Sequence, residues 1–194
     1  LRTAGFHVHM GLGKMEPTEA VRIVHGIDAL AGVMSVSLLA GLDDARRRIF
    51  YGRAGEYRLP MHGLEYRTLS SAGLVHPIVT HTLLELVRIG VGLGLAGLTV
   101  IDVGQPYIQE IIDTCDVAAA RQLLANYEKP LRALLKAQLG NPLLPPRVWA
   151  LVTQGARELL PTDDMAKNWR LGHSWGVHST SPDCSITTWD NAPA

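Results

Sequence analysis

The residue pattern that is typical of β-strands is confined to the first 70 residues of this 194-residue chain. Apolar and polar residues alternate over 4–12 (AGFHVHMGL), and the stretch from 50 to 70 indicates two strands joined by the turn-forming sequence LPMHG. Helical patterns take up most of the rest of the chain. This order of strand, helix, strands and then helices predicts an α+β fold, with an antiparallel sheet and the helices packed on one side of it.

Two long helices are expected, and each begins at a proline. Pro17 and Pro77 suit the first position of helices over 17–40 and about 77–96. Between them, LDDARRRI at 42–49 predicts a polar turn with a short helical piece.

The second half of the chain predicts shorter helices. Breaks are expected at Pro130 and at the NPLLPP segment, 141–146. The helices expected on either side of these breaks cover residues 106–114, 116–126, 130–139 and 146–160. The tail at 173–194 has no period, so we expect an irregular loop or a partner-contacting arm there.

Charge and cysteine content limit the classes of partner. The 18 basic and 18 acidic residues balance to zero, which argues against a nucleic acid or an anionic membrane bound by bulk electrostatics. The uncharged run Ile89–Ile101 is shorter than the roughly 20 residues that span a bilayer. Cys115 and Cys184 lie far apart and suggest no disulfide framework, which favours a reducing cytosol.

One stretch concentrates charge in a chain that is only 19% charged. FYGRAGEYRLPMHGLEYRTLS carries Arg53, Glu56, Arg58, Glu65 and Arg67. On a strand, Glu65 and Arg67 share one face and Tyr66 turns to the other. Such a run is typical of a solvated hairpin with weak cross-strand ion pairs. The alternative interpretation is an anion bound between these side chains.

His7 and His9 have the same spacing on the first predicted strand, so their imidazoles would project together. They indicate either a wet strand face or a metal site, in which both histidines bind the metal, or one binds it and the other contacts a substrate. A histidine and a carboxylate on adjacent strands suit Mg²⁺ or Mn²⁺, and neighbouring arginines suit phosphate or carboxylate oxygens. A metal beside an arginine clamp is what phosphoryl transfer requires.

A GxGxxG match at Gly92–Gly97 does not indicate a dinucleotide site. The motif lies at the end of an apolar helix, not between a strand and a helix. Its small residues instead favour close packing of helices.

Three segments together resemble a known family. GFHVHMGLG before a helix, then YGRAGEYR and HGLEYRTLS, resemble the glutamine-synthetase-like carboxylate–amine ligases, most closely the phage-type amidoligases (COOH–NH2 ligase type 2). The resemblance covers about residues 4–90. It implies an antiparallel sheet that forms a half-open funnel for ATP and an acceptor carboxylate. We therefore expect residues 1–100 to form the C-terminal part of a ligase-like catalytic sheet with its helices, and 101–172 a helical region of the same domain.

The resemblance also implies a reaction. In that family the γ-phosphate of ATP passes to a carboxylate, and an amine then attacks the acyl phosphate to give an amide. His7 and Glu65 resemble the histidine and glutamate that bind a metal at the ATP phosphates. Glu56 resembles a further metal ligand or a carboxylate that orients an arginine.

The arginines resemble the family's phosphate-binding groups. Arg67 resembles the arginine that holds the transferring phosphoryl group, and Arg53 and Arg58 resemble those that reach the nucleotide phosphates and the acceptor carboxylate. His9 is expected to contact substrate. The implied cofactors are ATP with Mg²⁺ or Mn²⁺, and the implied partners are a small-molecule or peptide carboxylate and an amine. An oligomer or assembly in the cytoplasm, the host's if the gene is phage-borne, is also expected.

We expect one strand of that family's site to be absent from the residues given. In the family an earlier strand carries two glutamates that complete the metal sites, and this chain begins at Leu1, after that position. We expect the strand to lie upstream or in another chain. If it does not, a structural or interaction protein on the same scaffold, such as a virion component, is the alternative. A zinc hydrolase is disfavoured, because such barrels need about 200 residues or more and alternating strands.

Overall fold

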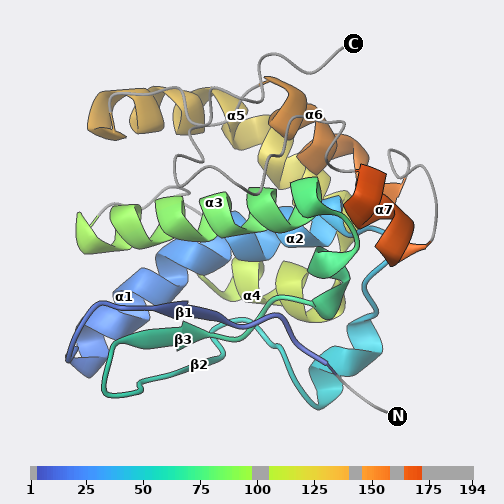
Figure 1. The fold of residues 1–194 in the computed structure, drawn as a ribbon. Coiled ribbons are helices and arrows are strands. Elements are labelled where there is room, and N and C mark those ends of the chain that lie inside the picture. Colours follow the sequence, from blue (N-terminus) through green and yellow to red (C-terminus); the bar gives the residue numbers. More distant parts are fainter. Residues whose placement is uncertain (1–3, 98–104, 140–145, 158–163, 172–194) are drawn as a thin grey trace.

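The computed structural model describes residues 4–97, 105–139, 146–157 and 164–171. Over these residues the chain has the predicted α+β fold: a small antiparallel sheet lies at one edge of the molecule, and the helices stack on one side of it (Figure 1). The tail at 173–194 that we expected to be irregular lies outside the described residues.

The sheet has three strands in the order β1 (Val8–Met10), β3 (Leu64–Tyr66) and β2 (Tyr57–Arg58). Both hairpin strands and the LPMHG turn between them are therefore confirmed, although the strands are shorter than predicted. Gly63 ends the turn at a φ of +147°, and a Cβ there would lie 2.0 Å from the carbonyl oxygen of Met10. Only glycine lets the turn pass this close to β1.

The first long helical segment follows the prediction with one difference. It consists of α1 (Pro17–Ile27), the π-helical turn η1 (Asp28–Gly32) and α2 (Val33–Leu38). The π-turn inserts a wider helical turn in the middle of the segment, and such turns are frequent at functional sites. All five residues of η1 are buried, with Asp28 among them.

The second long helix, α3 (Pro77–Leu95), confirms the sequence prediction and crosses α1 at very short distance. A Cβ on Gly90 would lie 2.7 Å from the Cα of Ile27, and a Cβ on Gly94 would lie 2.5 Å from the Cα of Ile23. The glycines of α3 thus let two helix backbones touch, as the sequence predicted. Gly92 does not take part, because a Cβ there meets no atom within 4 Å.

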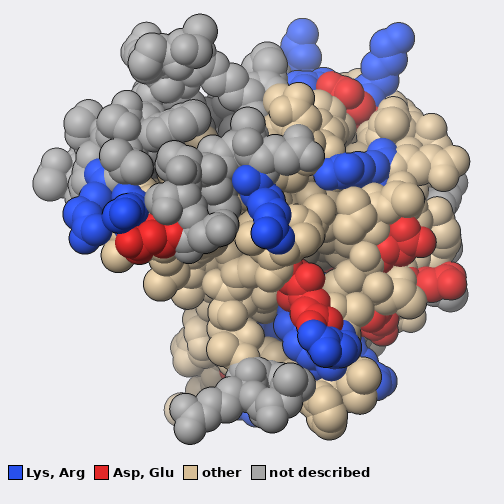
Figure 2. Space-filling view, turned by 90° about the vertical axis from the view of Figure 1, so that its right-hand side faces the viewer, with Lys and Arg blue, Asp and Glu red and all other residues tan. Residues whose placement is uncertain are grey.

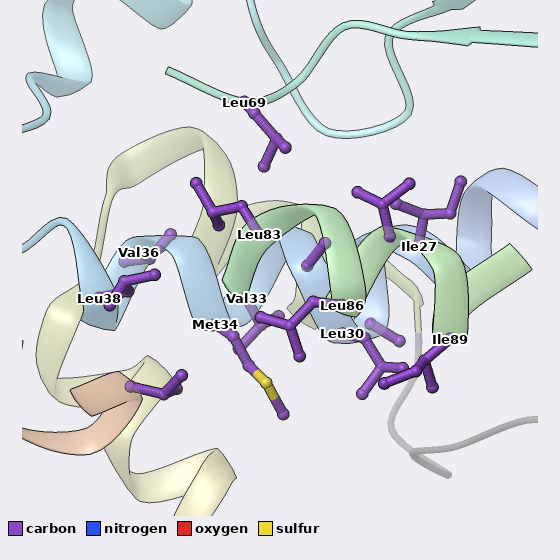
Figure 3. Close-up of a cluster of buried hydrophobic side chains, with 14 of the residues drawn as sticks. Ile27, Leu30, Val33, Met34, Val36, Leu38, Leu69, Leu83, Leu86 and Ile89 are labelled. Atoms are coloured by element: carbon purple, nitrogen blue, oxygen red, sulfur yellow. The ribbon is translucent and has the colours of Figure 1, made fainter. Parts of the chain in front are cut away.

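The hydrophobic core fills the space between these helices and the sheet. Figure 3 shows Leu83, Leu86 and Ile89 of α3 facing side chains of the first helical segment, with Leu69 reaching in from the side of the strands. The buried apolar side chains of the helical segment that are labelled there are Ile27, Leu30, Val33, Met34, Val36 and Leu38. The same core includes buried side chains of the sheet and of the later part of the chain, such as Tyr66, Ile112 and Leu124.

Two segments, Pro17–Leu38 and Pro77–Leu95, are long and apolar enough to cross a membrane by length and composition. In the folded chain 83% and 56% of their apolar windows are buried inside the molecule. Core helices of globular proteins pass the same test, so the two segments are weak evidence for a membrane span.

The later helices correct one prediction. They are α4 (Gln105–Thr114), α5 (Val117–Leu139), α6 (Pro146–Gln154) and α7 (Met165–Leu171). The break expected at Pro130 is wrong, because α5 continues through it. Proline removes one helical hydrogen bond, but buried Leu123, Leu124 and Leu131 hold α5 to the core on both sides of it. The sequence also did not predict α7.

Candidate active site

Three side chains from the predicted site meet on the face of the sheet that is turned away from the core. Glu65 lies in β3, Arg67 follows it by two residues, and His7 directly precedes β1. His7 Nδ1 lies 2.9 Å from Glu65 Oε1, and Arg67 Nε lies 3.4 Å from the same oxygen. Glu65 is only 7% exposed. A solvated hairpin does not bury its carboxylate, so that interpretation is wrong for this pair.

The opposite face of β3 is apolar apart from one hydroxyl. Tyr66 turns to this face, as the strand spacing predicted, and is fully buried, and its hydroxyl donates to Asp28 Oδ1 at 2.5 Å. Burial raises the pKa of Asp28 to about 7, even though hydrogen bonds from Tyr66 and Gly55 lower it. Burial also raises the pKa of Tyr66 well above its usual value. The π-turn thus places a buried carboxyl group directly behind the site strand.

Tyr51 joins the site, and sequence reasoning missed it. Its hydroxyl accepts from Arg67 Nε at 3.3 Å, and its ring lies 4.9 Å from the Arg67 guanidinium carbon. The same ring lies 5.3 Å from the ring of His7. Only its position in the charged stretch could have pointed to it, because a tyrosine among arginines is also common on a plain surface.

The loop at residues 52–56, the tied loop, runs beside Arg67 and is held by several hydrogen bonds. The amides of Gly52 and Arg53 donate to Glu56, the amide of Ala54 donates to Asp113 at 2.7 Å, and the amide of Gly55 donates to Asp28 at 2.7 Å. These four successive N–H groups are therefore satisfied inside the protein. They cannot form a phosphate cradle of backbone amides, so anion binding at this loop depends on side chains.

The tied loop contains two of the predicted site residues. Glu56 uses one carboxylate oxygen, Oε2, on the two loop amides. The Arg53 side chain is exposed and donates from Nε to the carbonyl of Arg48 at 2.8 Å. In addition, Arg67 N donates to the carbonyl of Glu56 at 2.9 Å, which fastens the loop to the end of β3.

Two buried arginines, Arg47 and Arg48, lie next to the tied loop. The sequence predicted a polar turn with a short helical piece at 42–49 and did not predict that these arginines are buried. They belong to η2 (Ala45–Ile49). Arg47 binds Asp43 through Nε and Nη2 at 2.6 and 2.9 Å, and Arg48 Nη2 binds it at 3.2 Å. Arg48 also donates to the carbonyl of Gly52.

The carboxylate between these arginines has a perturbed pKa. Burial alone would raise the pKa of Asp43, but hydrogen bonds and charge from Arg47 and Arg48 outweigh it and lower the pKa. The sequence signal was the DDARRR run, in which Asp43 and Arg47 have the i,i+4 spacing of a helical ion pair.

The remaining predicted residues lie at the exposed sides of the site. Arg58 in β2 and His9 in β1 both stand opposite Glu65 in the register, so one row crosses the three strands. Both are exposed, and the His9 ring stacks at 5.8 Å on His62 of the hairpin turn. Within the described residues Arg58 forms no ion pair, which leaves a cation available on this face.

The metal-binding capacity of the site is partial. Two ligands of one octahedral ion lie about 3 Å apart, and the 2.9 Å separation of His7 Nδ1 and Glu65 Oε1 fits that spacing. However, no group of three or more His, Cys, Asp or Glu side chains in the described part of the chain could hold a metal ion. The pair supplies two donors of a hard-cation site, which usually has about six.

The surface charge agrees with a local site. On the face shown in Figure 2, basic and acidic side chains are interspersed over the described residues, without a broad area of one sign. Recognition of an anion by this molecule therefore depends on particular arginines.

Comparison with known proteins adds the family. The family model described as phage phiEco32-like COOH.NH2 ligase-type 2 matches residues 3–171. Neither a curated protein nor a solved structure matches the chain significantly. The family match covers both the sheet with its site residues and the later helices. The chain therefore belongs to the phage phiEco32-like COOH.NH2 ligase-type 2 family.

Proposed function

We propose that this protein is an ATP- and divalent-metal-dependent ligase that joins a carboxylate to an amine through an acyl phosphate. The observation that carries the proposal is the convergence of His7 and Arg67 on one oxygen of Glu65. A histidine, a carboxylate and a guanidinium in one contact are groups that can hold a metal beside a phosphoryl group. The family, whose name is that of a carboxylate–amine ligase, supports the same reaction.

In this proposal Glu65 and His7 hold Mg²⁺ or Mn²⁺. The bound ion would neutralise charge on the ATP phosphates during transfer. The other ligands would be phosphate oxygens, water and carboxylates from outside the described residues. Glu56 is the weakest candidate, because it has one oxygen engaged with two loop amides.

The arginines divide between the two substrates. Arg67 is largely buried beside Glu65, at 13% side-chain exposure, which suits contact with the transferring phosphoryl group. Arg58 is exposed on the edge strand and suits the acceptor carboxylate, with His9 across the same row. Arg53 suits the nucleotide phosphates. A glutamine-synthetase-like funnel sheet, an oligomeric enzyme and a cytoplasmic location belong to the same proposal.

Trapping of the acyl phosphate tests the proposal. Full-length protein is incubated with ATP, Mn²⁺ and a panel of carboxylic acids, and hydroxylamine converts any acyl phosphate to a hydroxamate and inorganic phosphate. The expected result is hydroxamate formation that falls roughly 10²–10³-fold in Arg67→Ala, as when one charge-stabilising donor is removed. Glu65→Gln is expected to show a loss of similar size.

Glu85 and Arg88 provide matched controls. They form an exposed ion pair on α3, with Nη2 and Oε2 2.8 Å apart. Glu85→Gln and Arg88→Ala should keep wild-type hydroxamate formation. An active enzyme that is unaffected by Glu65→Gln and Arg67→Ala would contradict the proposed site.

The second candidate function is a non-catalytic structural or interaction protein, such as a virion component, on the same scaffold. The two-donor metal pair within the described residues favours it. It predicts that the protein does not consume ATP in the presence of Mn²⁺, and that Mn²⁺ and ATP do not raise its free energy of unfolding.

A further inference from the structure

Tyr51 lies between two side chains of the proposed site. Its hydroxyl accepts from Arg67 Nε at 3.3 Å, and its ring lies under the guanidinium at 4.9 Å. On the other side its ring lies 5.3 Å from the His7 ring, at an interplanar angle of 32°. One tyrosine therefore contacts both the cation and the imidazole.

The contacts of Arg67 use only part of its guanidinium. Nε is shared between Tyr51 Oη at 3.3 Å and Glu65 Oε1 at 3.4 Å. Among the described residues, Nη1 and Nη2 have no hydrogen-bond partner. Two restraints at Nε and a ring under the plane fix the orientation of the fork and leave its terminal N–H groups for a ligand.

Tyr51 also limits His7. The Nδ1 of His7 lies against Glu65, while its Nε2 is buried and has no hydrogen-bond partner among the described residues. A Cβ on Gly5 would lie 2.8 Å from this Nε2 and 2.8 Å from Tyr51 Oη. The ring of Tyr51 and the backbone of Gly5 thus enclose the side of the imidazole that does not face Glu65.

Gly5 provides the space that this arrangement needs. A Cβ there would approach Tyr51 Cε1 to 2.4 Å, so any other residue would displace the phenol. The backbone at this point is held firmly, since Phe6 N donates to the carbonyl of Leu69 at 3.0 Å and Gly5 forms a bridge with Ser70.

We infer that Tyr51 is a positioning residue that fixes Arg67 and His7 in a single arrangement before ligands bind. The inference rests on the proposed function for its role in turnover, but not for its contact with Arg67. A cation that is already oriented needs no reorganisation when charge develops on the phosphoryl group, and such preorganised groups lower the barrier to the chemical step. Removal of Tyr51 should therefore lower kcat more than it raises KM for ATP.

The test compares Tyr51→Phe and Tyr51→Ala, with Tyr107→Phe as the control. Tyr107 lies on α4 and is 39% exposed. In the hydroxamate assay we expect kcat to fall roughly 10-fold in Tyr51→Phe, from the lost hydrogen bond. In Tyr51→Ala we expect kcat to fall roughly 10²-fold, because Arg67 and His7 are no longer held in position. Tyr51→Phe retains the ring, so its kcat should lie between those of Tyr51→Ala and the wild type. Wild-type kcat in a folded Tyr51→Ala protein would overturn the inference.

A second readout does not require turnover. The Nε–H signal of Arg67 in a nitrogen-15 NMR spectrum is assigned by its loss in Arg67→Lys. We expect Tyr51→Phe to shift this signal and speed its exchange with water several-fold, and Tyr107→Phe to leave it unchanged. An unchanged signal in Tyr51→Phe would overturn the inference. If the wild-type protein forms no hydroxamate, the proposed function fails, and the NMR signal alone decides the role of Tyr51.

Discussion

Asp28 shows at the residue scale how the fold supports the site. This buried carboxyl group accepts from the Tyr66 hydroxyl behind the site strand and from the Gly55 amide in the loop that carries Arg53. Burial raises its pKa to about 7. The residue therefore links the strand and the loop through one titratable group.

The raised pKa predicts a pH dependence of stability. Below pH 7 the native state holds a proton on Asp28 that the unfolded state has already lost above about pH 4. The native state thus binds more protons over this window, so the contribution of Asp28 to the free energy of unfolding falls as pH rises from 4 to 7.

Asp28→Asn removes this titration. The free energy of unfolding of the wild type, relative to Asp28→Asn, should fall by on the order of 4 kcal/mol between pH 4 and pH 7.5. Urea denaturation of both proteins across this range measures the difference. Parallel stability curves for the two proteins would contradict a raised pKa of Asp28 in the native state.

The buried cluster of Asp43, Arg47 and Arg48 yields a second prediction at the residue scale. Asp43 holds both guanidinium groups, and Arg48 is only 2% exposed. Asp43→Asn leaves two buried cations without their counter-charge, which should cost about 3–5 kcal/mol of unfolding free energy.

The adjacent Asp44 supplies the control for this change. Asp44 binds Arg46 at the exposed surface, and asparagine is as good an N-cap for η2 as aspartate. Asp44→Asn should therefore leave the thermal midpoint unchanged. Equal effects of the two substitutions would mean that the cluster of Asp43 does not brace the fold.

At the element scale, the crossing of α1 and α3 depends on single glycines. Gly94→Ala would place a Cβ 2.5 Å from the Cα of Ile23, so a backbone must move, at a cost of about 1–3 kcal/mol. Gly92→Ala meets open space and gains helix propensity of up to about 1 kcal/mol.

Denaturant unfolding of these two variants isolates the effect of the close crossing, because both are Gly→Ala changes in the last turn of α3 and only one of them meets a neighbouring backbone. Destabilisation by Gly94→Ala, together with a neutral or stabilising effect of Gly92→Ala, would confirm the close crossing of α1 and α3. Stabilisation by both substitutions would show that the helices do not cross at this distance.

The elements also show what could be predicted from the sequence. The hairpin, both long helices and the α+β order followed from local patterns and from proline positions. The continuity of α5 through Pro130 did not, because it depends on core contacts of residues on both sides that local propensity does not contain. The π-turn at Asp28 likewise has no local signal.

The site was predictable where its geometry follows from strand spacing. Glu65 and Arg67 share a face, as the i, i+2 spacing indicated, and His7 contacts Glu65 from a position directly before the neighbouring strand β1. Tyr51 and the buried pair Arg47 and Arg48 come from the segment before the hairpin. Their contacts depend on how that segment folds back under the sheet, and no local sequence pattern predicts this path of the chain.

At the scale of the whole molecule, the two faces of the small sheet differ in their surroundings and in their proposed roles. The face toward the helices buries Leu64 and Tyr66 and is held by the core. The opposite face carries the proposed site. Because Leu64 and Tyr66 share one hydrophobic core with the helices, the site is built on strands that are packed against the rest of the molecule and not on a free hairpin (Figure 1).

The central claim is that the cluster of His7, Glu65 and Arg67 binds a metal–ATP complex, and thermal unfolding of the full-length protein with Mn²⁺ and ATP tests it most directly. A ligand at 100 times its dissociation constant adds about 2.7 kcal/mol of stability, which for a chain of this size raises the midpoint by roughly 5–10 °C. We predict this rise in the wild type and in Glu85→Gln, and its loss in Glu65→Gln. A midpoint that does not respond to saturating Mn²⁺ and ATP, or a rise that Glu65→Gln retains in full, would contradict the claim.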